Sequence, residues 1–75
     1  MKIRSQDGNR YMDYGEVYAA PWRGQGRAAL YALNEFHENP VCIGIYDDMD
    51  RARGVLYEIG LAYQNGERVF YLPVQ

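Results

Sequence analysis

The feature that most constrains the fold of this chain is an amphipathic segment from Asp48 to Gln64. Apolar residues recur in it at the three- and four-residue spacing that places them on one side of an α-helix. These residues are Ala52, Val55, Leu56, Ile59, Ala62 and Tyr63. Asp47 is placed to cap the first free amides, and the Asn65-Gly66 pair supplies a left-handed stop. The segment therefore predicts one helix whose apolar side covers another layer of the fold.

Turn signals in the first third of the chain predict short strands. Asp7-Gly8 separates two short runs and tolerates the positive φ of a tight turn, so residues 3–12 are expected to form a hairpin. Glu16–Ala20 predicts a third strand. Pro21 is expected to end that strand, because proline cannot donate a hydrogen bond to a sheet. The residues from Pro21 to Arg27 are then expected to form an exposed loop.

Residues 28–36 fit two structures. Their composition favours a helix, but their pattern also divides into the two faces of a strand. The run Val41–Tyr46 follows after a tight connection and is a clear apolar strand, with Val41, Ile43 and Ile45 expected on one face. Because such a run pairs readily with the segment before it, we expect residues 28–36 to form a strand.

A last run, Val69–Leu72, predicts a short edge strand that ends at Pro73. Together these elements predict an α+β fold, in which an antiparallel sheet of about 4–6 strands packs against one helix. The chain has 75 residues, so it is expected to be a single domain, residues 1–75.

The composition disfavours several classes of protein. The single cysteine, Cys42, cannot form an internal disulfide framework. Apolar runs are far below the roughly 18 residues that span a bilayer, and the first residues lack the apolar stretch of a secretion signal. A cytoplasmic location and no membrane contact are therefore expected. The net charge of −2 argues against binding to duplex DNA, which needs a concentrated basic face.

No pattern in the sequence indicates catalysis or metal binding. Asp47, Asp48 and Asp50 form an acidic cluster, but it lacks the glycine and the distal glutamate of a calcium loop, and a helix start explains it. His37 is the single histidine and lies in an expected turn, whereas Cys42 lies in an apolar strand. We therefore expect no enzymatic activity, no metal and no cofactor.

Two surfaces are candidate binding sites. Trp22, Arg23 and Arg27 combine a stacking ring with positive charge, which suits a nucleotide, a single-stranded nucleic acid or an acidic protein surface. The other interpretation of this segment is a solvated hairpin connection. Tyr57 and Leu61 lie four residues apart on the predicted helix, where they form either an outward apolar spot for a partner or the rim of the contact with the sheet.

Several segments of the chain resemble a group of small proteins encoded in phages, prophages and mobile elements of Gram-positive bacteria. The similar segments are Lys2–Gly8, Ile43–Tyr46, Arg51–Ala52, Val55–Ile59 and Tyr71–Pro73. They cover about half of the chain, and the Trp22–Arg27 segment falls outside them. The resemblance implies an antiparallel sheet with one helix, a mobile-element origin and no known enzymatic activity. It implies no site residues.

The expected function is that of a non-catalytic phage or prophage accessory protein that binds a host or phage protein. Inhibition of a host defence factor is one form that this function can take. A homo-oligomer is also expected, because eight tyrosines and the edges of a small sheet leave apolar surface to cover. The alternative function is a small-ligand or nucleotide sponge, in which the Trp22–Arg27 loop closes over an anionic ligand at an oligomer interface. The sequence leaves the partner and the number of subunits open.

Overall fold

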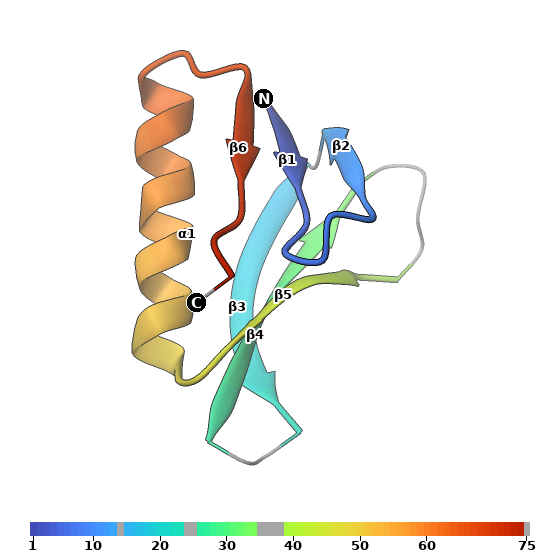
Figure 1. The fold of residues 1–75 in the computed structure, drawn as a ribbon, viewed down its shortest axis with the longest axis vertical. Helices are drawn as coiled ribbons and strands as arrows, with labels where there is room; N and C mark the ends of the chain where they lie inside the picture. The colour runs from blue at the N-terminus through green and yellow to red at the C-terminus, as the bar shows by residue number, and fades with distance from the viewer. Residues whose placement is uncertain (14, 24–25, 35–38, 75) are drawn as a thin grey trace.

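The computed structural model describes residues 1–13, 15–23, 26–34 and 39–74. In this part of the chain the predicted α+β fold is confirmed, with six strands and one helix (Figure 1). The elements are β1 (Lys2–Arg4), β2 (Tyr11–Asp13), β3 (Glu16–Trp22), β4 (Arg27–Leu33), β5 (Val41–Tyr46), α1 (Met49–Gln64) and β6 (Val69–Tyr71).

The strands form two three-stranded sheets rather than one continuous sheet. The first sheet has the order β2-β1-β6, and the second has the order β3-β4-β5. The predicted hairpin at Asp7-Gly8 is confirmed: β1 is antiparallel to β2, and Gly8 has a φ of +80°. The final strand, β6, is an edge strand as predicted, but it runs parallel to β1. A parallel pair needs a long connection, which the rest of the chain with α1 provides.

Strand β3 does not end where the sequence suggested. It continues through Pro21 and Trp22, which pair with Ala28 and Arg27 of β4. The prediction that Pro21 ends the strand is therefore wrong, and Pro21, Trp22 and Arg27 of the expected loop lie in strands. The reason is that β3 is an edge strand, where a proline can direct its missing donor away from the ladder.

The strand interpretation of residues 28–36 is confirmed over β4, while residues 35 and 36 lie outside the described part. Strand β4 is the central strand of its sheet, and Ala28, Leu30 and Ala32 have no exposed surface. A strand with helix-favouring residues is stable here because burial between neighbours outweighs intrinsic propensity.

A bulge in β5 separates side chains that the sequence placed on one face. The pairing of β4 with β5 shifts register between Leu30 and Tyr31. The extra residue in β5 moves the residues beyond it to the opposite face, because side chains alternate along a strand. Val41 and Ile43 pack in the core with α1, whereas Ile45 lies outside that core cluster. The prediction is therefore wrong at Ile45.

The helix begins one residue later than predicted. Asp48, not Asp47, is the N-cap, and its carboxylate accepts a hydrogen bond of 2.7 Å from the Arg51 amide. Asp48 has the extended backbone that a capping residue needs. The predicted stop is confirmed, since Asn65 is the C-cap and Gly66 has a φ of +76°.

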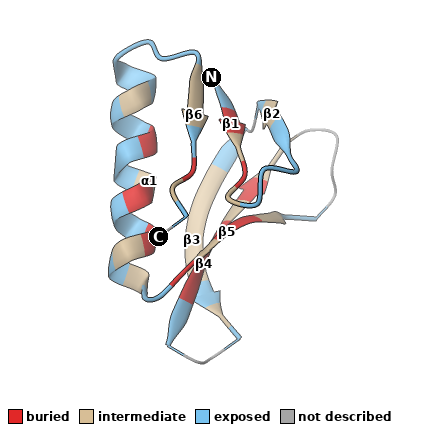
Figure 2. Ribbon diagram, viewed as in Figure 1, coloured by how far each residue is buried: buried red, intermediate tan, exposed pale blue. Residues whose placement is uncertain are grey.

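The apolar stripe of α1 faces the strands, as Figure 2 shows. Ala52, Val55 and Ile59 are buried, but Tyr63 is 70% exposed, so its predicted place in the buried stripe is wrong. Tyr63 lies in the last turn of the helix, at the margin of a pocket rather than over a sheet face. The buried core joins both sheets to the helix through Ile3, Ala28, Leu30, Ala32, Ile43, Tyr46, Ala52, Val55, Ile59 and Leu72.

The turn between β1 and β2 is built from side-chain hydrogen bonds. The buried Ser5 hydroxyl donates to the Asp7 carboxylate at 2.6 Å and accepts from the Arg10 amide at 3.0 Å. The same carboxylate accepts from the Asn9 amide at 2.9 Å. The hydrogen bond from Ser5 lowers the pKa of Asp7. The segment is therefore held in one conformation by its own side chains.

Gln6 uses its carboxamide to join three parts of the chain. Its Oε1 accepts a 2.8 Å hydrogen bond from the Ile45 amide, and its Nε2 donates to the Ile45 carbonyl at 2.9 Å. Nε2 also donates to the Val74 carbonyl at 2.7 Å. The Gln6 amide donates to the Ile43 carbonyl at 2.7 Å. Gln6 thus takes the place of a neighbouring strand beside β5 and ties β5 to the segment after β6.

We predict that Gln6→Ala lowers the free energy of unfolding by about 2–3 kcal/mol, because it leaves main-chain groups of Ile45 without partners. Urea denaturation measures the change. Gln64→Ala is the matched control, since Gln64 is exposed at the end of α1 and its loss should change the free energy by less than about 0.5 kcal/mol. Equal effects of the two substitutions would contradict the role of Gln6.

Tyr46 gives the fold a pH dependence at alkaline pH. The residue has no exposed surface, its hydroxyl donates to the Pro73 carbonyl at 2.8 Å, and burial raises its pKa to about 12. An unfolded tyrosine has a pKa of about 10. Between these values the unfolded chain has lost the proton that the folded chain retains, so the free energy of unfolding falls as the pH rises.

We predict that Tyr46→Phe costs about 1 kcal/mol at neutral pH, because the hydrogen bond to Pro73 is lost. Above pH 10 the difference between wild type and variant should shrink and then reverse, since phenylalanine has no proton to lose. Urea denaturation at several pH values checks this. Parallel pH profiles for the two proteins would show that Tyr46 is not the titrating group.

Candidate binding site

The sheet β3-β4-β5 has one face that α1 does not cover. Val17 and Ala19 of β3 pack towards the helix in the core cluster, so alternation directs Tyr18 and Trp22 to the other side. Paired residues of neighbouring strands lie on the same side of a sheet. Tyr31 of β4, which pairs with Tyr18, therefore also lies on this side. We call this side of the sheet the open face.

Three aromatic rings meet on the open face. The Tyr18 and Tyr31 rings stack with centroids 5.6 Å apart and an interplanar angle of 25°. The Trp22 ring lies 6.5 Å from Tyr31 at 36°. The Arg23 guanidinium lies 4.8 Å from the centroid of the Trp22 ring, within range of a cation–π interaction. Tyr18, Trp22 and Tyr31, all half-buried, form the aromatic cluster.

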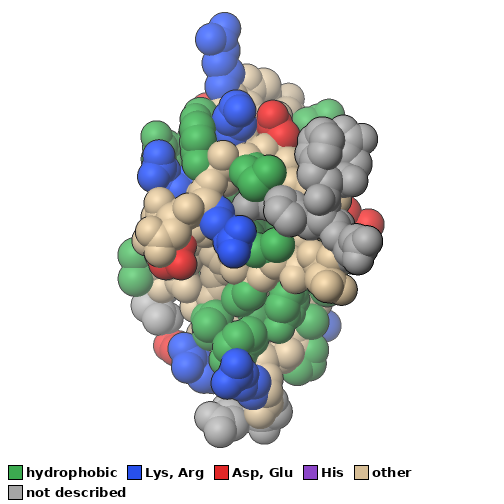
Figure 3. Space-filling model, turned by 90° about the vertical axis from the view of Figure 1, so that its right-hand side faces the viewer, with side chains coloured by type: hydrophobic (Ala, Val, Ile, Leu, Met, Phe, Trp, Pro, Cys, Tyr) green, Lys and Arg blue, Asp and Glu red, His purple; other side chains and the backbone are tan. Residues whose placement is uncertain are grey.

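The surface around the aromatic cluster is apolar and ends in basic side chains. In the lower half of Figure 3, hydrophobic side chains gather above Lys and Arg side chains, at the end of the molecule that carries the β3-β4 hairpin. The pairing of Trp22 with Arg27 places these two residues side by side at that end. The open face therefore combines aromatic area with a positive margin.

The structure brings together the first group of predicted site residues. Trp22 and Arg27 are paired strand residues, and Arg23 follows directly with a φ of +50°. Residues 24 and 25, the centre of the expected loop, lie outside the described part. Tyr18 and Tyr31 were not predicted as site residues. Their spacing is the signal, because Tyr18 and Trp22 fall on one face once the strand continues through Pro21.

The second predicted group lies elsewhere. Tyr57 is 69% exposed and Leu61 is 41% exposed, so both residues point outward from α1, which is one of the two alternatives that the sequence left open. They line a shallow hollow together with Gly60 and Gln64. Because α1 covers the opposite face of the sheet, this surface and the open face are on different sides of the molecule.

A second set of aromatic and basic residues lies on the other sheet and was not predicted. Tyr11 and Tyr71 are the pairing partners of Arg4 in the two neighbouring strands. The Arg4 guanidinium lies 5.0 Å from the Tyr11 ring centroid and 5.9 Å from that of Tyr71. It also donates to the Gly8 carbonyl at 3.2 Å. These contacts hold the Arg4 guanidinium against the surface of its sheet, which indicates that this charge stabilises the fold.

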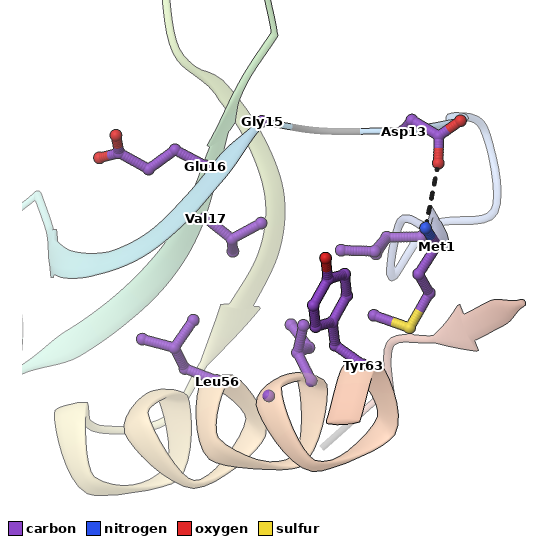
Figure 4. Close-up of a pocket in the computed structure, with 10 residues that line it drawn as sticks. Met1, Asp13, Gly15, Glu16, Val17, Leu56 and Tyr63 are labelled. Carbon is purple, nitrogen blue, oxygen red and sulfur yellow. Dashed lines mark ion pairs between the residues drawn. The ribbon is translucent and has the colours of Figure 1, made fainter. Parts of the chain in front are cut away.

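A hollow lies between α1, β1 and the start of β3 (Figure 4). Its volume is about 510 Å³. Val17, Leu56 and Tyr63 contribute apolar walls, and Asp13 at its margin pairs with the Met1 amino group at 3.4 Å. The Glu16 side chain points away from the hollow in Figure 4.

Two paired residues of β4 and β5, Tyr31 and Cys42, have raised pKa values. Burial raises the pKa of the Cys42 thiol, which favours the protonated form over the nucleophilic thiolate. Burial also raises the pKa of Tyr31. Within the described ranges, no three His, Cys, Asp or Glu side chains come together as a metal site. His37 lies outside those ranges.

Comparisons with known proteins give no family assignment. The chain matches no protein-family model, no curated protein and no solved structure. In the described part of the chain, no helix has both the length and the apolar character needed to cross a membrane.

Proposed function

We propose that this chain is a non-catalytic protein-binding module that docks its partner on the open face. The observation that carries the proposal is the aromatic cluster with Arg23 on a sheet face that α1 leaves uncovered. Tryptophan, tyrosine and arginine are the residues that contribute most to the stability of protein interfaces. The aromatic residues among them combine large contact area with a polar tip on a side chain that has few rotatable bonds.

The geometry of the rings favours a protein surface over a base-stacking platform. A nucleic-acid platform presents free ring faces to successive bases. Here Tyr18 and Tyr31 stack on each other, and Arg23 covers part of the Trp22 ring. Small side chains, Ala20 and Ala29, lie between the aromatic residues in the same register. The result is a closely packed apolar surface of the kind that another protein side chain can contact.

The resemblance to phage and mobile-element proteins extends this proposal. The partner is then a host or phage protein, and binding blocks a surface that the partner needs, as in inhibition of a host defence factor. A non-catalytic binding protein blocks only the fraction of its partner that it occupies. This part of the proposal rests on the resemblance and on no feature of the open face.

The alternative function is a nucleotide or small-anion sponge. The observation in its favour is the positive margin of the open face, where Arg23 stacks on Trp22 and Arg27 pairs with Trp22 across the hairpin. Such a group can bind an anion next to an aromatic ring. The two functions differ in the ligand that stabilises the folded chain.

We predict that tagged wild-type protein retains a stoichiometric partner from a lysate of a Gram-positive bacterium, and that Trp22→Ala weakens this binding at least about 30-fold. Tyr31→Ala should have a similar effect, because it removes the ring that contacts both other members of the cluster. Titration of the retained partner with each purified variant gives the dissociation constants.

Tyr57→Ala is the matched control, because it removes an exposed tyrosine from the far side of the molecule. It should leave the dissociation constant unchanged. Loss of binding in Tyr57→Ala with retention in Trp22→Ala would move the site to the helix and contradict the proposal. A melting temperature that rises with a nucleotide panel in wild type but not in Trp22→Ala would favour the sponge.

A further inference from the structure

Strand β3 is an open edge. It is the terminal strand in the order β3-β4-β5, and among the described residues its main-chain pairing is with β4 alone. The exposure of its alanines agrees: Ala19 and Ala20 are half-exposed, whereas their pairing partners in β4, Leu30 and Ala29, have no exposed surface. A seven-residue edge of this kind is a template for another strand.

The position of Pro21 determines which main-chain groups face outward. The residues on both sides of it, Ala20 and Trp22, remain paired with β4. Because Pro21 has no N–H and ladder bonds alternate along an antiparallel strand, the even-numbered residues bond to β4. The amides of Val17 and Ala19 and the carbonyls of Val17, Ala19 and Pro21 then face the open edge.

We propose that two copies of this chain associate through β3, antiparallel and about a two-fold axis at Ala19, to form one continuous six-stranded sheet. In this register Ala19 lies opposite Ala19 of the second copy, and Val17 lies opposite its Pro21. The amides of Val17 and Ala19 donate to the carbonyls of Pro21 and Ala19 across the axis. The missing donor of Pro21 therefore leaves four hydrogen bonds intact in the pair of strands.

The side chains of β3 are complementary in this register. Tyr18 lies opposite Ala20 of the second copy, so a large side chain meets a small one on the open face. Val17 meets Pro21, two apolar residues, on the helix side. The two-fold axis repeats each contact. The matching of sizes favours this register over one centred on Tyr18, which would place the two Tyr18 rings against each other.

Charge also matches across the axis. Glu16 lies opposite Trp22 of the second copy, and the Arg23 guanidinium is held 4.8 Å from that Trp22 ring. Glu16 is exposed, its side chain points away from the hollow beside α1, and it makes no ion pair with the described residues (Figure 4). The register thus gives two identical Glu16–Arg23 pairs. An unrelated extended peptide would satisfy the main chain of β3 but not these two charges.

The proposal predicts a charge-swap phenotype. Wild type should change from the monomer mass of 8.7 kDa to twice that mass as its concentration rises, measured by light scattering after gel filtration. Glu16→Arg and Arg23→Glu should each weaken the dimer at least about tenfold, because like charges then meet at both ends of the paired strands. The double variant E16R/R23E should restore the wild-type dissociation constant.

Glu67→Arg is the matched control: it makes the same charge change at an exposed residue between α1 and β6 and should leave dimerisation unchanged. Far-UV circular dichroism confirms that each variant is folded. A wild type that stays monomeric up to about 1 mM would overturn the proposal, since even weak interfaces associate there. So would a folded double variant that remains as weak as the single ones.

These measurements use purified protein without a partner, so they are independent of the proposed function. A monomeric wild type that still binds its partner through Trp22 would remove the dimer and leave the binding module. A dimer that the charge swap restores, together with no partner whose binding depends on Trp22, would support the dimer and contradict the proposed binding module.

Discussion

The carboxamide of Gln6 is the interaction on which the arrangement of this small fold depends. The sheet β3-β4-β5 has a second edge at β5, and the sheet β2-β1-β6 is too small to be stable by itself. Gln6 follows β1, pairs with Ile45 of β5, and reaches Val74 after β6. One side chain therefore closes an edge that would otherwise be exposed and fixes the two sheets relative to each other. Tyr46 reinforces the same junction through Pro73.

Closure at β5 leaves an asymmetric molecule. One face of the larger sheet is covered by α1, and one edge is covered by Gln6. Within the described ranges, the open face and the β3 edge are then the parts of that sheet left for partners. The residues on these two surfaces differ in type. The face carries aromatic rings and arginine, which suit a protein contact, whereas the edge offers main-chain groups with alanine side chains. The composition of each surface thus follows from what the rest of the fold leaves uncovered.

The sequence predicts the elements well because their signals are local. The stripe of α1 and the strand at Val41–Tyr46 are set by periodicity and burial within a few residues. Prediction from the sequence fails where pairing with a distant segment determines the structure. The bulge that turns Ile45 outward depends on pairing with β4, and Pro21 stays in β3 because β3 is the terminal strand of its sheet. The aromatic cluster was only partly found for the same reason: Tyr31 joins Trp22 through the hairpin register, which no local pattern contains.

The two proposed contacts of β3 are compatible because they use different groups of the same strand. Partner binding uses the even-numbered side chains Tyr18 and Trp22, whereas strand pairing uses the outward main chain of Val17 and Ala19. Tyr18 and Trp22 also lie beside the second copy in the paired strands, opposite Ala20 and Glu16. Arg23 takes part in both contacts, because its guanidinium can contact the Trp22 ring with its plane and a carboxylate with its edge. Pairing at β3 would place two aromatic clusters on one continuous face. A partner that engages both clusters would then bind more tightly than one cluster allows, through effective concentration alone.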